Sequence, residues 1–146
     1  MRVEHTEVIE APVADVWKAF EDPSVFQQWQ TNLLEYEQLE GSFTKVGGVA
    51  RMKAKQVGTT NELTVTVVER DARKRMVKYH YEGAQAPFEI LNRFRALDGG
   101  GTEWTATLDV QLSLLTRALG PVLKPLANEL VKGNGKNFRE WCEAQL

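Results

Sequence analysis

The sequence predicts an α+β fold: an antiparallel β-sheet of about six or seven strands, two short helices after the first strand, and a long C-terminal helix. Three observations predict it. A segment rich in β-branched residues at 3–9 precedes two helical stripes that are broken at Asp22-Pro23. Residues 33–111 alternate between apolar and polar side chains with regularly spaced turn residues, and residues 120–146 return to helical spacing.

The size of the chain predicts one domain over residues 1–146, because 146 residues form one ordinary core and no repeat, linker or low-complexity tract divides them. Charge is nearly balanced, with 18 Lys and Arg against 20 Asp and Glu. The net charge therefore favours no polyanion, and we expect no nucleic-acid partner.

Cysteine usage and hydropathy predict a soluble, cytoplasmic protein. Cys142 is the single cysteine, so no internal disulfide can form, and the N-terminus lacks the pattern of a secretory signal. The longest apolar-rich stretch, residues 112–126, is interrupted by polar and charged residues and is too short to span a bilayer. We expect no membrane insertion and a monomer or weak homodimer.

The first strand and the two short helices follow from proline placement. The strand at residues 3–9 stops at Ala11-Pro12, where proline suits the first turn of a helix. Apolar residues then recur at helical spacing: Val13, Val16, Trp17 and Phe20, followed after Asp22-Pro23 by Val25, Phe26 and Trp29. The second helix has only about two turns, so both helices must pack on a sheet to be stable.

The alternating segment predicts an antiparallel meander with turns at five places: near Gly47-Gly48, 57–61, 71–74, 83–87 and 98–101. The glycines of the last turn supply the positive φ of a hairpin. Alternation breaks at Val67-Val68 and Met76-Val77, which could be bulges. A one-residue slip there would exchange Tyr79 and Tyr81 for His80 and Glu82 on the inner face.

The C-terminal helix is predicted from one apolar side: Leu119, Leu123, Leu126, Leu130, Phe138 and Trp141. Gly133 and Gly135 lie inside this pattern, where glycine costs up to about 1 kcal/mol relative to alanine. We expect a bend, or a close approach of another segment, at these glycines.

Three stretches of the chain resemble a known superfamily: APVADVWKAFEDPSVFQQW at 11–29, GGGTEWTATLDV at 99–110 and GNGKNFREWCE at 133–143. With the order of elements, they resemble the START/Bet v 1-like superfamily, often called SRPBCC, and within it the polyketide cyclase/dehydrase group. The likeness covers nearly the whole chain. The third stretch departs from the family pattern, because Phe138 and Trp141 stand where leucines are usual.

This resemblance implies a helix-grip fold, a curved antiparallel sheet wrapped around the C-terminal helix, with an apolar cavity that opens near the two short helices. A sheet curled around one helix has more inner area than the helix fills, so we expect room for an apolar ligand of ordinary pocket volume.

Few residues are candidates for metal binding or for nucleophilic catalysis. The two histidines, His5 and His80, are isolated, and Cys142 has no partner, so we expect no metal and no cofactor. No serine lies in a Gly-x-Ser-x-Gly turn, and the glycine pairs lack the lysine and helix of a phosphate loop.

Polar and aromatic residues on the expected inner faces are the better candidates. Tyr79 and Tyr81 share a strand face and carry hydroxyls that need partners, while Asn92 falls among aromatics on the next strand. The side chains that we expect around the cavity are Phe26, Trp29, Met52, Leu63, Val65, Tyr79, Tyr81, Phe88, Asn92, Phe94, Trp104, Leu130, Asn134 and Phe138.

Three functions remain open at this point. The first is binding, transport or sequestration of a small hydrophobic ligand, which we favour because the polar candidates are neutral or weak acids. The second is a cyclase or dehydratase type of enzyme acting on a polyketide-like or other apolar molecule. The third is a protein-interaction module acting through the basic stretch 70–78 or the apolar stretch 112–123.

Overall fold

The computed structural model describes residues 1–56, 58–114 and 116–146. Its elements follow the predicted order: β1 (Arg2–Ile9), α1 (Val13–Phe20), the 3₁₀ helix η1 (Pro23–Val25), α2 (Phe26–Trp29), β2 (Leu33–Glu40), β3 (Val49–Gln56), β4 (Thr59–Asp71), β5 (Met76–Glu82), β6 (Phe88–Ala96), β7 (Thr102–Val110), the 3₁₀ helix η2 (Arg117–Leu119) and α3 (Gly120–Gln145). The α+β class is confirmed.

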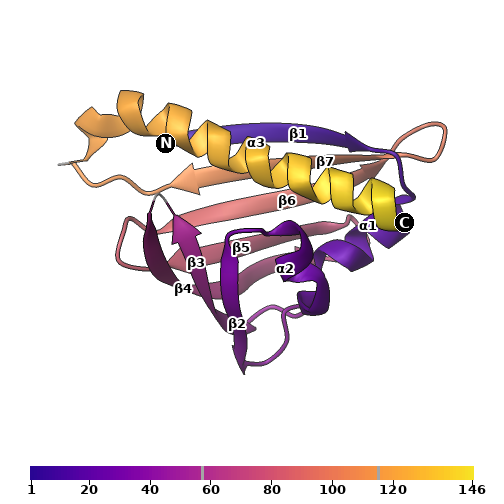
Figure 1. The fold of residues 1–146 in the computed structure, drawn as a ribbon, viewed down its shortest axis with the longest axis horizontal. Helices are drawn as coiled ribbons and strands as arrows, with labels where there is room; N and C mark the ends of the chain where they lie inside the picture. The colour runs from indigo at the N-terminus through magenta and orange to yellow at the C-terminus, as the bar shows by residue number, and fades with distance from the viewer. Residues whose placement is uncertain (57, 115) are drawn as a thin grey trace.

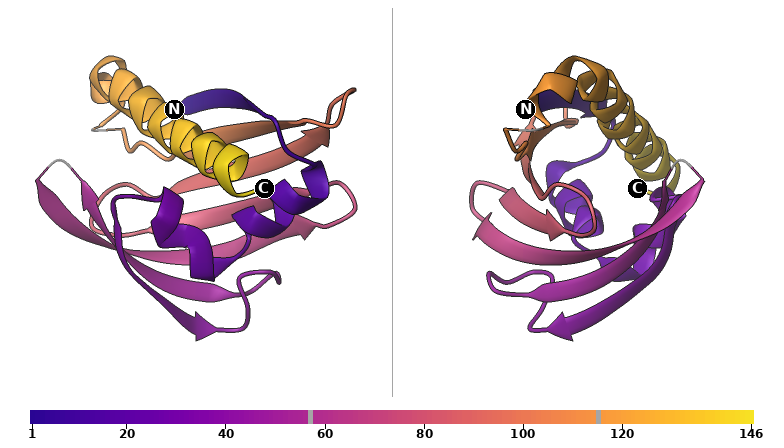
Figure 2. Two further views of the ribbon diagram at one scale, coloured as in Figure 1. Left: turned by 45° about the vertical axis from the view of Figure 1, so that its right-hand side comes forward. Right: turned by 90° about the vertical axis from the view of Figure 1, so that its left-hand side faces the viewer.

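All seven strands form one antiparallel sheet in the order β1-β7-β6-β5-β4-β3-β2. The strands from β2 to β7 form the predicted meander, and β1 pairs with β7 along its whole length. The sheet curls, and α3 lies across its concave side, while α1 and α2 close the end beneath the C-terminal half of α3 (Figures 1 and 2). This arrangement is the predicted helix grip.

The break between the two short helices lies at Asp22-Pro23, as the sequence predicts, and the Asp22 side chain caps η1. Asp22 accepts hydrogen bonds from the backbone N–H and the hydroxyl of Ser24, at 3.0 and 2.7 Å. Pro23 occupies the first position of η1, where its missing N–H leaves no donor unpaired. The chain therefore turns within a few residues and directs Phe26 and Trp29, both buried, into the core.

The strand register decides which residues face inward. A bulge lies between Val67 and Glu69, as predicted, whereas the pairing runs without irregularity through Met76 and Val77. Tyr79 is therefore buried on the inner face and His80 lies on the outer face. At the last hairpin, Gly99 and Gly100 have φ of +94° and +96°, which is the conformation that glycine was expected to supply. The predicted turn at 57–61 begins at Val57, which lies outside the described residues.

The predicted buried side of α3 is wrong along its N-terminal half. Leu119, Leu126 and Leu130 are each about half exposed. The residues that α3 buries are instead smaller on average: Ala127, Val131, Gly135, Phe138 and Cys142. At Gly135 the reason is steric, because a side chain there would overlap with His5 and Glu7 of β1.

Gly135 is the point of closest approach between α3 and β1. A Cβ atom there would lie 2.9 Å from Cδ2 of His5 and 3.1 Å from Cγ of Glu7, whereas one at Gly133 would meet open space. The close contact is reinforced by Arg139, whose Nη1 donates to Glu7 at 3.0 Å. The close approach expected from the two glycines is thus confirmed at Gly135.

We predict opposite effects for the two glycines of α3. Gly133→Ala should raise the free energy of unfolding by up to about 1 kcal/mol, because alanine favours the helix and meets nothing. Gly135→Ala should lower it by about 1–3 kcal/mol, because the added methyl overpacks the contact with β1. Urea denaturation of both variants measures this; a stability shift of the same sign in both would contradict the assignment.

Candidate ligand cavity

A cavity of about 90 Å³ lies beneath α3, at the end of the sheet that α1 and α2 close. Its walls come from the short helices, the loop before β3, four strands and α3. They consist of Phe20, Phe26, Trp29, Gln30, Phe43, Met52, Tyr79, Tyr81, Ile90, Asn92, Trp104, Ala106, Val131 and Asn134. Pockets for drug-sized ligands usually measure about 300–1,000 Å³, so the expected pocket volume is not reached.

Aromatic rings account for the small volume. Phe20 lies at the centre of the cluster, with ring centroids of Phe94, Trp104 and Phe138 at 5.0, 5.3 and 5.4 Å. Phe43, from the loop before β3, stacks on Tyr79 at 4.7 Å. Rings from the helices, the loop and the strands therefore fill most of the inner area that the curled sheet leaves free.

The structure brings eight of the fourteen expected residues together around the cavity: Phe26, Trp29, Met52, Tyr79, Tyr81, Asn92, Trp104 and Asn134. Three others, Val65, Phe94 and Phe138, are buried in the surrounding core. Leu63 and Phe88 are half-buried outside the lining. Leu130 does not line the cavity as expected: it is 49% exposed, and its neighbour Val131 lies in the lining instead.

Six lining residues were not among the expected ones: Phe20, Gln30, Phe43, Ile90, Ala106 and Val131. Ile90 and Ala106 share strand faces with Asn92 and Trp104, so alternation alone indicated their side. Phe20 lay on the predicted inner stripe of the first short helix. Phe43 comes from an irregular loop, where no periodicity indicates which way a side chain points.

Two buried polar atoms in the described part of the chain have no hydrogen-bond partner: the Tyr79 hydroxyl and Trp29 Nε1. Both residues line the cavity. By contrast, Trp104 Nε1 donates to Asn92 Oδ1 at 3.1 Å, which satisfies that oxygen within the protein. Burial raises the pKa of Tyr79 well above its ordinary value of 10, so its hydroxyl remains a donor at neutral pH.

The lining carries no carboxylate, histidine, lysine, arginine or cysteine among the described residues. His80 lies outside, where its Nδ1 and Nε2 atoms are each 3.0 Å from a carboxylate oxygen, of Glu89 and Glu82 respectively. The slip that would bring His80 and Glu82 inward does not occur. Within the described ranges, no group of three or more His, Cys, Asp or Glu residues is arranged so that it could hold a metal ion.

A partly buried ion pair fastens the end of α1 to the sheet beside the cavity. Arg70 donates from Nε and Nη2 to the two carboxylate oxygens of Glu21, at 2.7 and 2.8 Å. Its guanidinium also lies 5.3 Å from the ring centre of Trp17. Because Arg70 is engaged in this pair, it cannot serve the surface contact that the basic stretch 70–78 was expected to offer.

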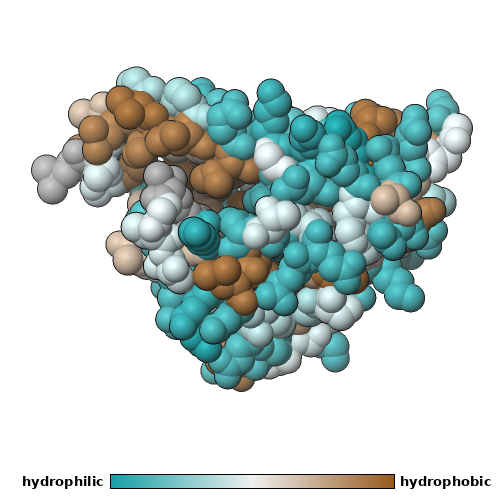
Figure 3. Space-filling view, in the orientation of Figure 1, coloured by the Kyte–Doolittle hydropathy of each residue, from teal (hydrophilic) through white to brown (hydrophobic). Residues whose placement is uncertain are grey.

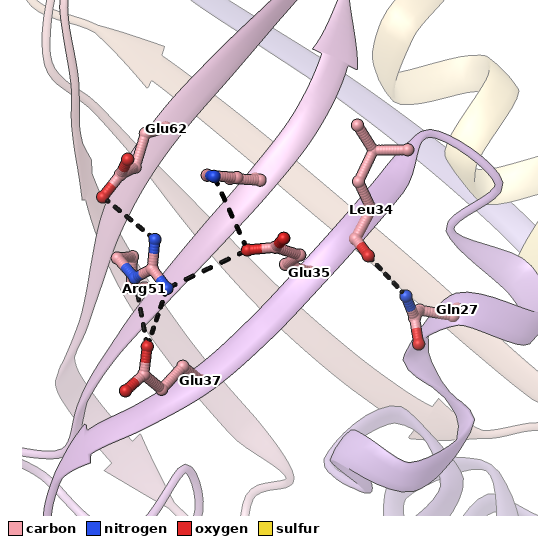
Figure 4. A network of polar contacts seen from close by, with 7 residues as sticks. Gln27, Leu34, Glu35, Glu37, Arg51 and Glu62 are labelled. Carbon is pink, nitrogen blue, oxygen red and sulfur yellow. Dashed lines mark hydrogen bonds and ion pairs between the residues drawn. The ribbon is translucent and has the colours of Figure 1, made fainter.

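The basic residues of β3 also have partners, on the outer face of the sheet. Arg51 pairs with Glu37 at 2.8 Å and with Glu62 at 3.4 Å, and Lys53 pairs with Glu35 (Figure 4). The run is a solvated strand face with cross-strand ion pairs. In the same view Gln27 of α2 donates to the backbone oxygen of Leu34, which holds α2 against β2.

A sheet that grips one helix over an apolar cavity is the architecture of START/Bet v 1-like proteins, and solved structures agree. A START superfamily protein from Mycobacterium smegmatis matches with a TM-score of 0.84 at 18% identity over 99% of each chain. Ara h 8.0201 matches with a TM-score of 0.80 at 15% identity over 99% of each chain. The Zhui aromatase/cyclase from Streptomyces sp. R1128 matches with a TM-score of 0.75 at 18% identity, over 99% of this chain and 92% of that one. At such identities these similarities show the fold alone.

The family described as "Polyketide cyclase / dehydrase and lipid transport" matches residues 1–143. The chain therefore belongs to this family, within the START/Bet v 1-like (SRPBCC) superfamily. Among curated proteins, none matches the chain. In the described ranges no helix is long and apolar enough to cross a membrane.

We predict that Arg70→Met lowers the free energy of unfolding by about 3–5 kcal/mol, because it leaves the Glu21 carboxylate buried without a counter-charge. The double variant Glu21→Leu/Arg70→Met should recover most of this loss, since neither charge then remains. Urea denaturation of both variants measures these changes in the free energy of unfolding. A double variant as unstable as the single one would show that the loss comes from packing.

The pairing of His80 predicts a pH-dependent stability. Its hydrogen bond to Glu82, followed by the weaker effect of Glu89, raises the pKa of His80 above 6.5, although burial acts in the opposite direction. A pKa raised in the folded state stabilises the protein fully below the unfolded pKa, and this stability disappears as pH rises through the folded value. Glu82→Gln/Glu89→Gln should therefore destabilise the protein at about pH 5.5 and much less at about pH 9.

Urea midpoints at both pH values measure this difference. Glu140→Gln, which removes an exposed carboxylate on α3, is the control and should show no comparable pH dependence. An equal loss at both pH values in the double variant would contradict the role of His80.

Proposed function

We propose that this protein binds a small, uncharged, hydrophobic molecule in the cavity beneath α3, and that the molecule is a flat ring compound with an acceptor oxygen. The observation that carries the proposal is the pair of buried donors, the Tyr79 hydroxyl and Trp29 Nε1, which have no partner in the protein and line the cavity. A buried donor left unpaired costs about 1–3 kcal/mol, so a ligand oxygen that accepts from it gains a specific contact.

The composition of the walls supports the choice of ligand class. Seven of the fourteen lining residues are aromatic, which favours flat rings through stacked and edge contacts. A charged ligand would lose its hydration without meeting a counter-charge, because no ionisable group except two tyrosines lines the cavity. The family's description, which includes lipid transport, agrees with an apolar ligand.

The volume limits the size of what enters without rearrangement. A cavity of 150 Å³ in another protein holds benzene, and the cavity here measures about 90 Å³. Even a one-ring ligand must therefore displace aromatic side chains such as Phe43, which comes from a loop, or Trp29 on α2, and a larger ligand must displace them further. We expect one-ring probes to bind weakly and larger natural ligands to widen the cavity.

Catalysis is the less favoured function for this cavity. Acid–base steering of a ring closure needs a group with a pKa near neutral beside the substrate. Burial raises the pKa of both Tyr79 and Tyr81, so neither hydroxyl can act as a base at neutral pH. The remaining polar groups of the lining, from Asn92, Asn134 and Gln30, are neutral amides. They can orient a ligand but cannot exchange a proton with it.

We predict that Tyr79→Phe raises the stability of the protein and weakens its binding of a ligand with an acceptor oxygen. The empty variant should be more stable than the wild type by roughly 1–3 kcal/mol, because the unpaired hydroxyl is gone. Acetophenone should raise the melting temperature of the wild type more than α-methylstyrene, its isostere without the oxygen. In Tyr79→Phe the preference for acetophenone should shrink, with acetophenone bound about 2- to 10-fold more weakly, while Trp29 Nε1 still offers a donor.

Tyr36→Phe is the matched control, because the Tyr36 hydroxyl donates to Gln38 and the residue does not line the cavity. It should lose about 1 kcal/mol of stability and keep the preference for acetophenone. A wild type that responds equally to both probes, or to neither, would refute the proposed use of the two donors.

A further inference from the structure

A stripe of apolar side chains on α3 faces solvent. Leu119, Val122, Leu126 and Leu130 recur at intervals of three and four residues, so they share one helical face. With Leu114 they form what we call the apolar tip, whose side chains are between 49 and 84% exposed. Figure 3 shows hydrophobic surface gathered over the N-terminal half of α3, the part of the chain to which Val122, Leu126 and Leu130 belong. Apolar residues grouped in this way mark an interaction surface.

The same part of the chain is positively charged. Residues 117–136 hold four exposed cations, Arg117, Lys124, Lys132 and Lys136, against the single acid Glu129. The whole chain has a net charge of −2, so cations are concentrated here. None of the four forms an ion pair with another described residue, unlike Arg51, Lys53 and Arg70 elsewhere. The apolar tip therefore lies on a segment of the chain that carries exposed, uncompensated positive charge.

We propose that the apolar tip docks peripherally on an anionic lipid bilayer. Side chains such as Val122 and Leu126 would enter the boundary between headgroups and acyl chains, while the cations remain at the level of the lipid phosphates. Each lysine or arginine close to an anionic surface contributes about 1 kcal/mol, and buried apolar area adds to this. The contact requires no membrane-spanning helix.

Charge complementarity selects a bilayer over a second copy of this chain. A symmetric dimer through the apolar tip would place the same surface on both subunits and bring the four cations of each copy together. This repulsion opposes a dimer and favours an anionic surface.

The apolar tip and one wall of the cavity lie on the same helix. Val131 and Asn134 line the cavity, and Leu130 precedes Val131 on the same helix, so α3 carries both the cavity wall and the apolar tip. A bilayer contact here would place a source of apolar molecules next to the helix that covers the cavity. The docking itself does not depend on the nature of the cavity ligand.

Flotation with lipid vesicles tests the proposal. The full chain should float with vesicles of mixed phosphatidylcholine and phosphatidylglycerol at low NaCl, and much less with pure phosphatidylcholine or at high NaCl. Val122→Ser should weaken binding about tenfold, because a buried valine is worth about 1.5 kcal/mol. Lys124→Glu should weaken it by about tenfold or more.

Matched controls are available elsewhere on the surface. Val8→Ser removes a valine of similar exposure on β1, and Lys45→Glu reverses an exposed lysine in the loop before β3; both should bind vesicles as the wild type does. Tyr79→Phe should also bind normally, which separates this proposal from that of the cavity ligand.

Three results would overturn the proposal. The first is a wild type that does not float with anionic vesicles at low salt. The second is equal weakening by Val122→Ser and Val8→Ser, which would show that the tip is not the site. The third is a wild-type dimer in sedimentation equilibrium that Val122→Ser converts to monomer, which would make this face an interface between copies.

Discussion

The packing of aromatic rings around Phe20 is the interaction on which the rest of the structure depends. Phe20 is the last residue of α1, and its ring contacts Trp29 of α2, Phe94 and Trp104 of the sheet, and Phe138 of α3. One side chain thus sets the distance between all the layers of the fold. The curl of the sheet creates the interior, and these rings determine how much of it stays empty.

Polar contacts at the edge of this cluster hold the helices in place. The pair of Glu21 with Arg70 anchors the end of α1 to β4, and the bond from Trp141 Nε1 to Gln28 ties α3 to α2. On the other side of α3, the missing side chain of Gly135 lets the helix reach β1. The cavity is therefore the space that remains after these contacts have fixed α1 and α3, and its unpaired donors lie where the rings leave a gap.

The helix α3 has two apolar faces with different roles. One carries Ala127, Val131, Gly135 and Phe138 and packs on the sheet, with the closest fit to β1 at Gly135. The other carries leucines and stays in solvent along the N-terminal half. Cavity wall and exposed surface thus share one rigid element. A contact made by the exposed face acts directly on the helix that covers the cavity.

The sequence by itself determined the element order, the meander, the break at Asp22-Pro23 and the inward direction of Asn92 and Trp104, whereas the strand register of the structure decided between Tyr79 and His80. These features follow from local constraints, namely proline chemistry and the two-residue period of a strand. Only the tertiary structure decided which apolar stripe of α3 is buried, because two stripes compete on one helix and the approach at Gly135 chooses between them. It also decided the contribution of Phe43, the pairing of Glu21 with Arg70 across 49 positions, and the small cavity volume. These features depend on distances between segments far apart in the chain, which no local pattern encodes.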